Sequence, residues 1–175
     1  MTFNEFICKL ELDHFKPEEL LVGNNEPNSK PPCKLWNNIV PTILIVQKLR
    51  KYFDVPIYLS SAYRNEEYNR TIKNAAPRSL HQAFAALDIR FDGSYKGELT
   101  LKDLYEKLKS WRDMGKWFKS PVPICTCPET LSDGQETPHE NLEVHETDNG
   151  YEFRFKGYLR LYATHIHIDT RGYNE

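Results

Sequence analysis

The feature that most restricts how this chain can fold is the alternation of apolar and polar residues in GYEFRFKGYLRLYATHIHIDT, at 150–170. Successive side chains of a β-strand point to opposite faces of a sheet, so this pattern is typical of strands with one buried face. Lys156 and Gly157 interrupt the alternation. We therefore expect a β-hairpin in which this pair separates the two strands.

The last alternating run places three polar groups on one face of a strand. His165, His167 and Asp169 are two positions apart, whereas Ile166 and Ile168 point the other way. A single histidine on such a face is most simply explained as a solvent-exposed residue above a buried apolar face. Two histidines with an aspartate favour a metal site, because imidazole and carboxylate groups are the ligands of catalytic zinc.

A second pair of histidine and aspartate occurs far away in the sequence, in SLHQAFAALDIRF at 79–91. His81 and Asp88 are seven positions apart, and Leu87 and Ile89 flank Asp88 with the alternation of a strand. A catalytic zinc site typically has three protein ligands and one position open for water. His81, Asp88 and one histidine of the HIH segment would provide such a set, and the other histidine could then transfer a proton.

The rest of the sequence contains both helical and strand-like segments. Helices are expected at 16–22, 35–53, 65–75 and 100–118, and strands at 55–64 and 86–91. A chain of 175 residues can bury one hydrophobic core, so we expect a single domain over residues 1–175. The weakly periodic, proline-containing residues 119–150 predict an irregular loop with one short strand, within an insertion at about 96–150.

Composition and charge argue against two classes of partner. Lysine and arginine are spread along the chain and the formal net charge is −2, so the basic surface of a nucleic-acid-binding protein is missing. The longest apolar run, IVPTILIV at 39–46, is far shorter than the roughly 20 residues of a membrane span. The N-terminus has acidic residues where a signal peptide is basic and then apolar, so we expect cytoplasmic synthesis without a signal peptide.

Cys125 and Cys127 form a C-x-C pair that leaves two interpretations open. They could bind zinc together with His139 or His145. However, the spacing differs from that of structural zinc sites and no second cysteine pair follows. The alternative is that both are ordinary loop thiols.

Three segments together resemble a known family. SSAYRNEEYN at 60–69, SLHQAFAALD at 79–88 and HIHID at 165–169 are similar, in this order, to the S-x-Y-R, S-x-H-x-x-G-x-A-x-D and H-x-H motifs of the M15 zinc peptidases. This family includes D-Ala-D-Ala carboxypeptidases and phage endolysins. The resemblance extends over residues 14–95 and 151–172.

The resemblance implies a fold and a metal site. The fold would be of the α+β class, with a small, mainly antiparallel sheet packed with helices and a zinc site on the sheet, as in M15 and hedgehog-like proteins. One Zn²⁺ would be bound by His81, Asp88 and His167. His165 would be the general base or would stabilise the transition state, and Arg64 would bind a substrate carboxylate or the oxyanion.

Three further residues follow from the same comparison. Ser79 matches the motif serine and would support the site or contact the substrate. Asp169 could orient a ligand histidine, or simply cap the end of its strand. Phe84 stands where the family has glycine, and because an aromatic residue disfavours positive φ, we expect a differently built turn with local repacking. A Phe84 ring inside the cleft would allow zinc binding without cleavage.

The function implied by the resemblance is hydrolysis of an amide bond in peptidoglycan peptides by a monomeric zinc peptidase. The bond would be that of a D-Ala-D-Ala carboxypeptidase or a stem-peptide endopeptidase, and release to the cell wall would fit a phage or prophage origin. Two alternatives stay open: a non-catalytic zinc-stabilised binding or virion structural module on the same fold, and an interaction domain without metal.

Overall fold

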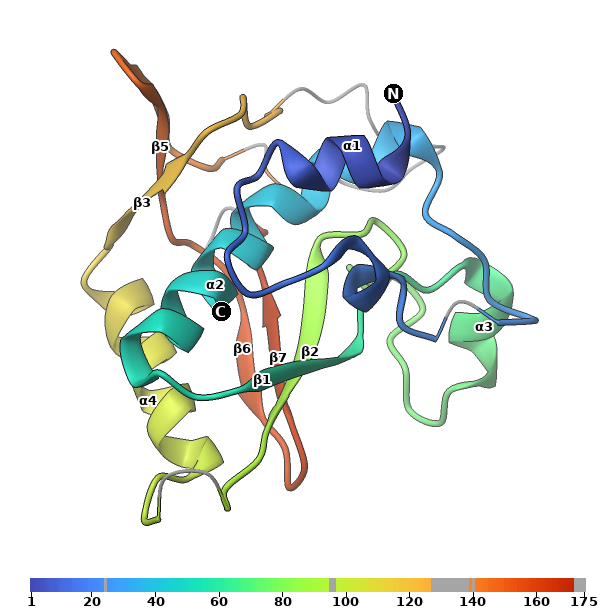
Figure 1. Ribbon diagram of the computed structural model, residues 1–175. Helices are drawn as coiled ribbons and strands as arrows, with labels where there is room; N and C mark the ends of the chain where they lie inside the picture. Colours follow the sequence, from blue (N-terminus) through green and yellow to red (C-terminus); the bar gives the residue numbers. More distant parts are fainter. Residues whose placement is uncertain (24, 95–96, 127–138, 140, 172–175) are drawn as a thin grey trace.

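The computed structural model of the protein describes residues 1–23, 25–94, 97–126, 139 and 141–171. Two small antiparallel sheets pack with helices around one hydrophobic cluster, which confirms the predicted α+β class (Figure 1). The helices are α1 (Phe3–Cys8), α2 (Val40–Phe53), α3 (Glu66–Thr71) and α4 (Leu101–Asp113), with 3₁₀ helices η1 (Pro17–Leu21) and η2 (Cys33–Ile39).

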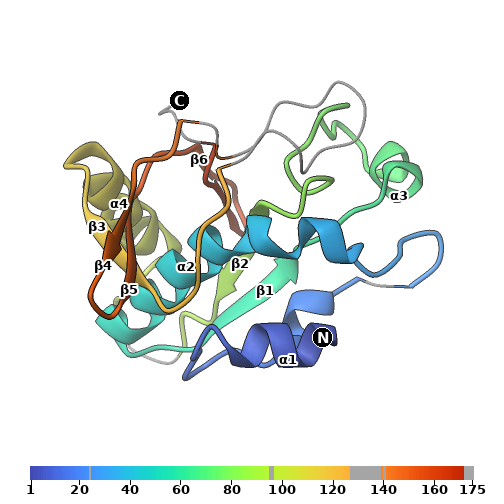
Figure 2. The ribbon, with the colours of Figure 1, turned by 90° about the horizontal axis from the view of Figure 1, so that it is seen from above.

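The larger sheet has the strand order β1-β2-β7-β6, and each neighbouring pair is antiparallel. Its strands are β1 (Ile57–Ser61), β2 (Ala86–Phe91), β6 (Leu159–Leu161) and β7 (Ile166–Asp169). Helix α2 covers one face (Figure 2). The Thr42 hydroxyl of α2 donates a hydrogen bond to the Ala85 carbonyl, next to β2, at 2.8 Å. Leu87 and Ile89 of β2 and Ile166 and Ile168 of β7 are fully buried. Asp88 and His167 alternate with them and therefore lie on the opposite face.

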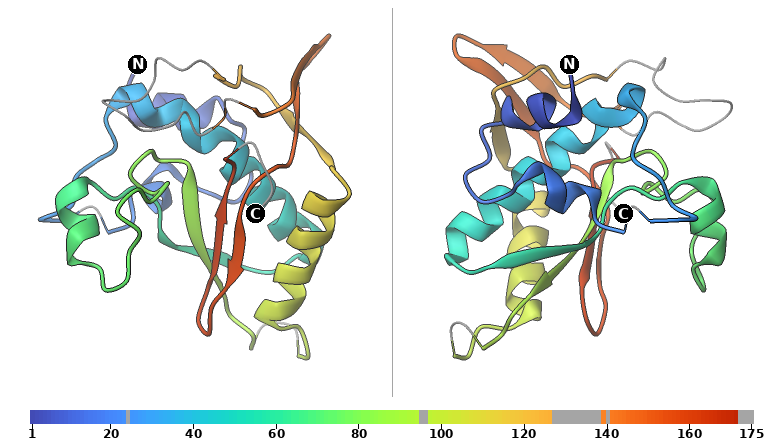
Figure 3. Two further views of the ribbon diagram at one scale, coloured as in Figure 1. Left: turned by 180° about the vertical axis from the view of Figure 1, so that it is seen from behind. Right: turned by 45° about the vertical axis from the view of Figure 1, so that its right-hand side comes forward.

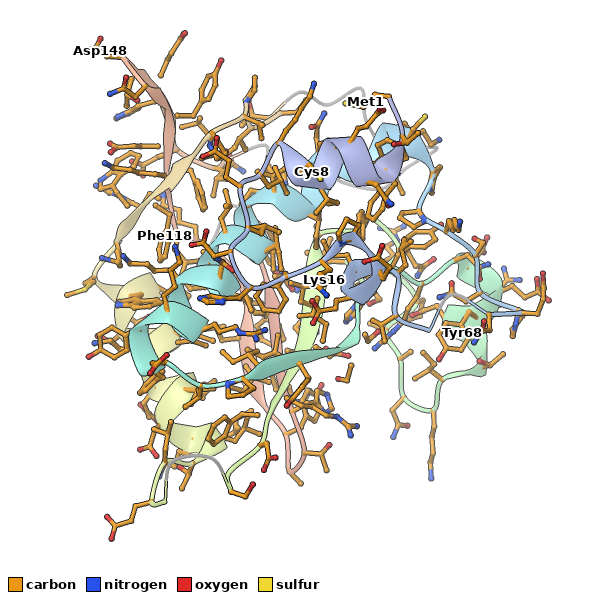
Figure 4. All side chains as sticks on the ribbon, in the orientation of Figure 1. Met1, Cys8, Lys16, Tyr68, Phe118 and Asp148 are labelled. Carbon is orange, nitrogen blue, oxygen red and sulfur yellow. The ribbon has the colours of Figure 1, made fainter. Side chains whose placement is uncertain are left out.

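The smaller sheet has the strand order β3-β5-β4 and lies beside α2 and α4 (Figure 2). Its strands are β3 (Trp117–Ser120), β4 (Val144–Thr147) and β5 (Gly150–Arg154). The rings of Phe118 and Phe153 stack with centroids 5.7 Å apart and join the main hydrophobic cluster. Asp148, labelled in Figure 4, marks the tip of the β4–β5 hairpin, which extends away from the helices.

The hairpin expected at Lys156-Gly157 is wrong. Strand β5 belongs to the smaller sheet, and the hairpin is formed by β6 and β7, which pair over Leu159–Leu161 and Ile166–Ile168 (Figure 3). The chain at Gly157 passes directly against the end of β7, where an added Cβ would lie 1.8 Å from the Asp169 carbonyl oxygen. Gly157 therefore allows the chain to pass close to the end of β7 and does not form a hairpin turn.

The helices differ from the expected ranges at their ends. The segment at 35–53 divides into η2 and α2, because Pro41 near the first turn favours the start of a new helix. Helix α4 begins at the Thr100 capping box, as its sequence indicates, but ends at Asp113, and Gly115 with φ 64° redirects the chain into β3. Helix α1, with its own capping box, was not anticipated.

Phe84 adopts the backbone conformation that its sequence argued against. Its φ is 55°, in the left-handed region, so the expectation that an aromatic residue avoids positive φ at this position is wrong. The Phe84 ring is fully buried, with its centroid 6.2 Å from that of Phe3 and 6.1 Å from that of Tyr63. Core packing of the ring therefore offsets the steric cost of a left-handed backbone.

This balance predicts the effect of restoring glycine. Phe84→Gly should destabilise the fold by about 1–4 kcal/mol, because loss of a buried ring costs about 3–5 kcal/mol and relief of the left-handed backbone returns about 1–2 kcal/mol. Phe84→Ala should be less stable than Phe84→Gly, because alanine retains the strain. Urea unfolding at fixed zinc concentration measures both. Equal stability of the two variants would contradict the proposed balance.

Candidate metal centre

The structure brings together three of the predicted site residues. Asp88 on β2 and His167 on β7 are direct cross-strand partners, and His81 comes from the segment before β2. One Asp88 carboxylate oxygen lies 3.2 Å from His81 Nε2 and 3.0 Å from His167 Nδ1. Ligand atoms of the three residues all lie within 4.8 Å of one another, so the group could hold a metal ion.

Hydrogen bonds at the outer nitrogens orient both imidazoles. His81 Nδ1 lies 2.6 Å from the Ala62 carbonyl oxygen and must donate to it. His167 Nε2 lies 3.0 Å from an Asp169 carboxylate oxygen and donates in the same way. In the neutral tautomers, the remaining lone pairs of both rings therefore point toward the Asp88 carboxylate. Three converging lone pairs require a positive charge between them, and a metal ion fits this requirement.

The pKa values follow from the same convergence. Burial disfavours a charged imidazole at His167, but hydrogen bonds with Asp169 and Asp88 outweigh burial and raise the pKa of His167 to about 9. Burial would raise the pKa of the Asp88 carboxyl, yet the hydrogen bonds with His167 and His81 hold it far below its ordinary value. Both shifts mean that the site favours a positive charge beside Asp88, and a bound metal ion would provide such a charge.

His81 and His165 stay neutral more readily than His167. Burial lowers the pKa of His81, which is 1% exposed, below its ordinary value. Burial also lowers the pKa of the half-buried His165. The His165 ring stacks on Tyr162 at 4.5 Å between centroids and lies in the same cleft as His167. A neutral imidazole in this position can accept a proton.

Arg64, which follows β1, and Ser79, which precedes His81, both contact the candidate ligands. Arg64 Nη2 lies 2.6 Å from the second Asp88 oxygen, and its Nε donates to the Ser61 hydroxyl at 2.9 Å. The guanidinium is therefore held against the carboxylate in this structure. The Ser79 hydroxyl accepts a weak hydrogen bond from the His81 amide at 3.3 Å, which helps to fix the backbone of His81.

Asp169 is fully buried behind His167. Besides its bond to His167, it accepts two hydrogen bonds from the Arg171 guanidinium, at 2.9 and 2.8 Å, and one from the Tyr158 amide at 3.3 Å. Hydrogen bonds with His167 and Arg171 lower its pKa although burial opposes this. Asp169 thus stays ionised and has the contact that orienting His167 requires.

A cleft of about 610 Å³ opens beside the three candidate ligands. All of the following predicted residues line it: Arg64, Ser79, His81, Asp88, His165 and His167. Tyr158, Arg160 and Tyr162 also line the cleft and were not expected from the sequence. The alternation in YLRLY at 158–162 could have indicated these residues, because its strand pairs with the strand that carries HIHID. Phe84 lies in the core and is not part of the lining.

The C-x-C interpretation can be followed only in part, because Cys127 lies outside the described residues. Both ring nitrogens of His139 already face carbonyl oxygens, Nδ1 toward Thr170 at 2.6 Å and Nε2 toward Asn38 at 2.9 Å. The ring of His145 packs against Trp117 with centroids 4.6 Å apart. Over the ranges that the structure describes, the His81, Asp88 and His167 group is the candidate metal site.

Fold and site define a candidate metal centre on an antiparallel sheet, in which two imidazoles and one carboxylate face an open cleft. The family model described as Peptidase M15 matches residues 13–117, and the chain belongs to this peptidase family. No curated protein and no solved structure matches the chain. The match contains His81 and Asp88, whereas His167 lies beyond it and reaches the site through the β2–β7 pairing.

The match confirms the M15 family and makes the protein a metallopeptidase with a peptide substrate. In the part of the chain that the structure describes, none of the helices has the length and apolar character needed to cross a membrane.

Proposed function

We propose that the protein is a zinc peptidase of the H-x-H type that hydrolyses an amide bond in peptidoglycan peptides. The observation that carries this proposal is the convergence of two imidazole lone pairs and a carboxylate at an open cleft. The motif resemblance supports a D-Ala-D-Ala carboxypeptidase or a stem-peptide endopeptidase as the form of the activity.

His81, Asp88 and His167 would hold one Zn²⁺, and neutral imidazoles with one carboxylate suit this ion. Zinc in such a site supplies an activated water and polarises the carbonyl of the amide. Asp169 accepts the hydrogen bond of His167 Nε2 and thereby keeps Nδ1 free for the metal.

The remaining roles belong to residues of the cleft. His165 accepts a proton from the attacking water and passes it to the departing amine, for which its lowered pKa is suited. Arg64 donates hydrogen bonds to the developing oxyanion or to a substrate carboxylate. Ser79 lines the cleft and contacts the substrate.

We further propose that residues 1–175 act as one monomeric zinc peptidase domain with an insertion at about 96–150. Cytoplasmic synthesis followed by release to the cell wall, as for a phage endolysin, is consistent with this activity. The alternative of a non-catalytic module was favoured by the unaligned insertion at about 96–150 and by a Phe84 ring that would fill the cleft. Burial of the Phe84 ring in the core removes the second of these two supports.

Hydrolysis of muropeptides by the zinc-loaded protein tests the function, and His165→Ala tests its proton transfer. We expect mass spectrometry to show shortened stem peptides, and His165→Ala to lower kcat by about 10²–10⁴-fold while keeping stoichiometric zinc. His145→Ala, at an exposed residue of β4, is the matched control and should keep the wild-type kcat and stoichiometric zinc.

Two outcomes would contradict these roles. Absence of cleavage across carboxypeptidase and endopeptidase substrates, with zinc bound, would favour the non-catalytic module. Loss of zinc in His165→Ala would mean that His165 and His167 have exchanged roles.

A further inference from the structure

Arg160 faces the metal group from the side opposite to Arg64. Strand pairing aligns Ser61 with Asp88, Asp88 with His167, and His167 with Arg160, so one row crosses the whole sheet. Directly opposed residues of antiparallel strands project from the same face. Arg160 therefore projects from the face that carries the candidate ligands, one strand beyond His167, and lines the cleft.

The two arginines of this row differ in their partners. Arg64 is paired with the Asp88 carboxylate. Arg160 has no carboxylate partner among the described residues, and its guanidinium packs on the Tyr162 ring, 4.8 Å from the centroid. The stacked aromatic ring supports the planar guanidinium and leaves its N–H groups available to a ligand.

The rest of the cleft adds to the positive charge. The basic side chains in its lining are Arg64, Lys73, Arg78, Arg160 and Arg171, and the acidic one is Asp88. Lys73 and Arg78 are exposed on the segment that follows α3, and neither has an ion pair within the described ranges. Although the whole chain has a net charge of −2, this cleft is electropositive and would concentrate anions.

We propose that Arg160, together with Arg78 and Lys73, forms a carboxylate-binding subsite that selects acidic peptides. The inference deepens the proposed function and rests on it for the location of the scissile amide. Arg160 determines specificity: its fork binds a substrate carboxylate in a bidentate manner, while Arg64 remains beside Asp88. A substrate with an acidic group flanking the cleaved bond would then span the metal group and reach β6.

The test compares binding of matched acidic and neutral peptides. The probes are acetylated peptides that contain D-Ala-D-Ala and differ only in D-glutamate or D-glutamine, placed before this pair in one set and after it in the other. Calorimetric titration uses zinc-loaded protein in the His165→Ala background, so that binding is measured without turnover. We expect at least one glutamate peptide to bind about 10-fold more tightly than its glutamine counterpart.

Arg160→Gln should reduce this preference to near unity, and Arg160→Lys should retain part of it, because lysine keeps the charge without the fork. Lys102→Gln, at an exposed α4 residue outside the cleft lining, should leave the preference unchanged. Equal affinity for glutamate and glutamine peptides in both sets, or an unchanged preference in Arg160→Gln, would overturn the subsite. A glutamate preference without any cleavage by the wild-type protein would support the subsite and reject the peptidase function.

Discussion

His81→Ala should abolish stoichiometric zinc binding and, with it, peptide hydrolysis. The variant removes one of the three ligands, because the lone pair of His81 Nε2 is directed at the Asp88 carboxylate. Changing only a hydrogen-bonding partner of a ligand typically lowers metal affinity about 10–100-fold, so loss of the ligand itself should exceed about 10²-fold. Asp88→Ala should behave alike. Elemental analysis of the purified proteins and zinc titration with a competing chelator measure the loss.

The control for this prediction is a histidine of similar chemistry outside the cleft. His145→Ala should retain one zinc per chain, because this exposed residue of β4 packs against Trp117 in the smaller sheet. Retention of stoichiometric zinc in His81→Ala or Asp88→Ala would reject the proposed ligand set. Absence of zinc in the wild-type protein after purification with zinc present would favour a dismantled metal site.

Local patterns predicted the β-strands that carry the site but not their partners. The alternation around Ile166 and Ile168 specifies which face of β7 is buried, and this depends only on the period of a strand. It cannot specify that β5 joins another sheet, because the two runs on either side of Gly157 have the same pattern. The assignment of β5 to the smaller sheet goes together with the close approach of Gly157 to Asp169, a contact between residues twelve positions apart.

The same distinction applies to the candidate site. The motif residues His81 and Asp88 could be proposed from sequence because their chemistry and spacing recur in the family. Arg160 could not, because its position depends on the register of β6 with β7. Phe84 shows the opposite error: residue preference argued against a left-handed backbone, and burial of the ring in the core outweighed that preference.

Arg64→Ala should keep zinc and lower turnover by about 10²–10³-fold, the usual effect of removing one donor to an oxyanion. Two features of Arg64 bear on its role. Its guanidinium bonds to the Asp88 carboxylate, and it also lines the cleft beside His81. Zinc retention is expected because the ion compensates the charge of Asp88 once the guanidinium is gone. Zinc affinity and kcat/KM, measured on the same protein, check both parts.

Comparison at saturating zinc separates catalysis from support of Asp88. If Arg64 acts on the substrate, the rate stays low when zinc is in excess, and Arg64→Lys recovers only part of it because lysine lacks the planar fork. If Arg64 only holds Asp88, zinc affinity falls and excess zinc restores the rate. An unchanged rate in Arg64→Ala with full zinc would remove both roles. Because Arg64 is only 13% exposed and already bonded to Asp88, a catalytic role requires its guanidinium to reach the substrate from that position.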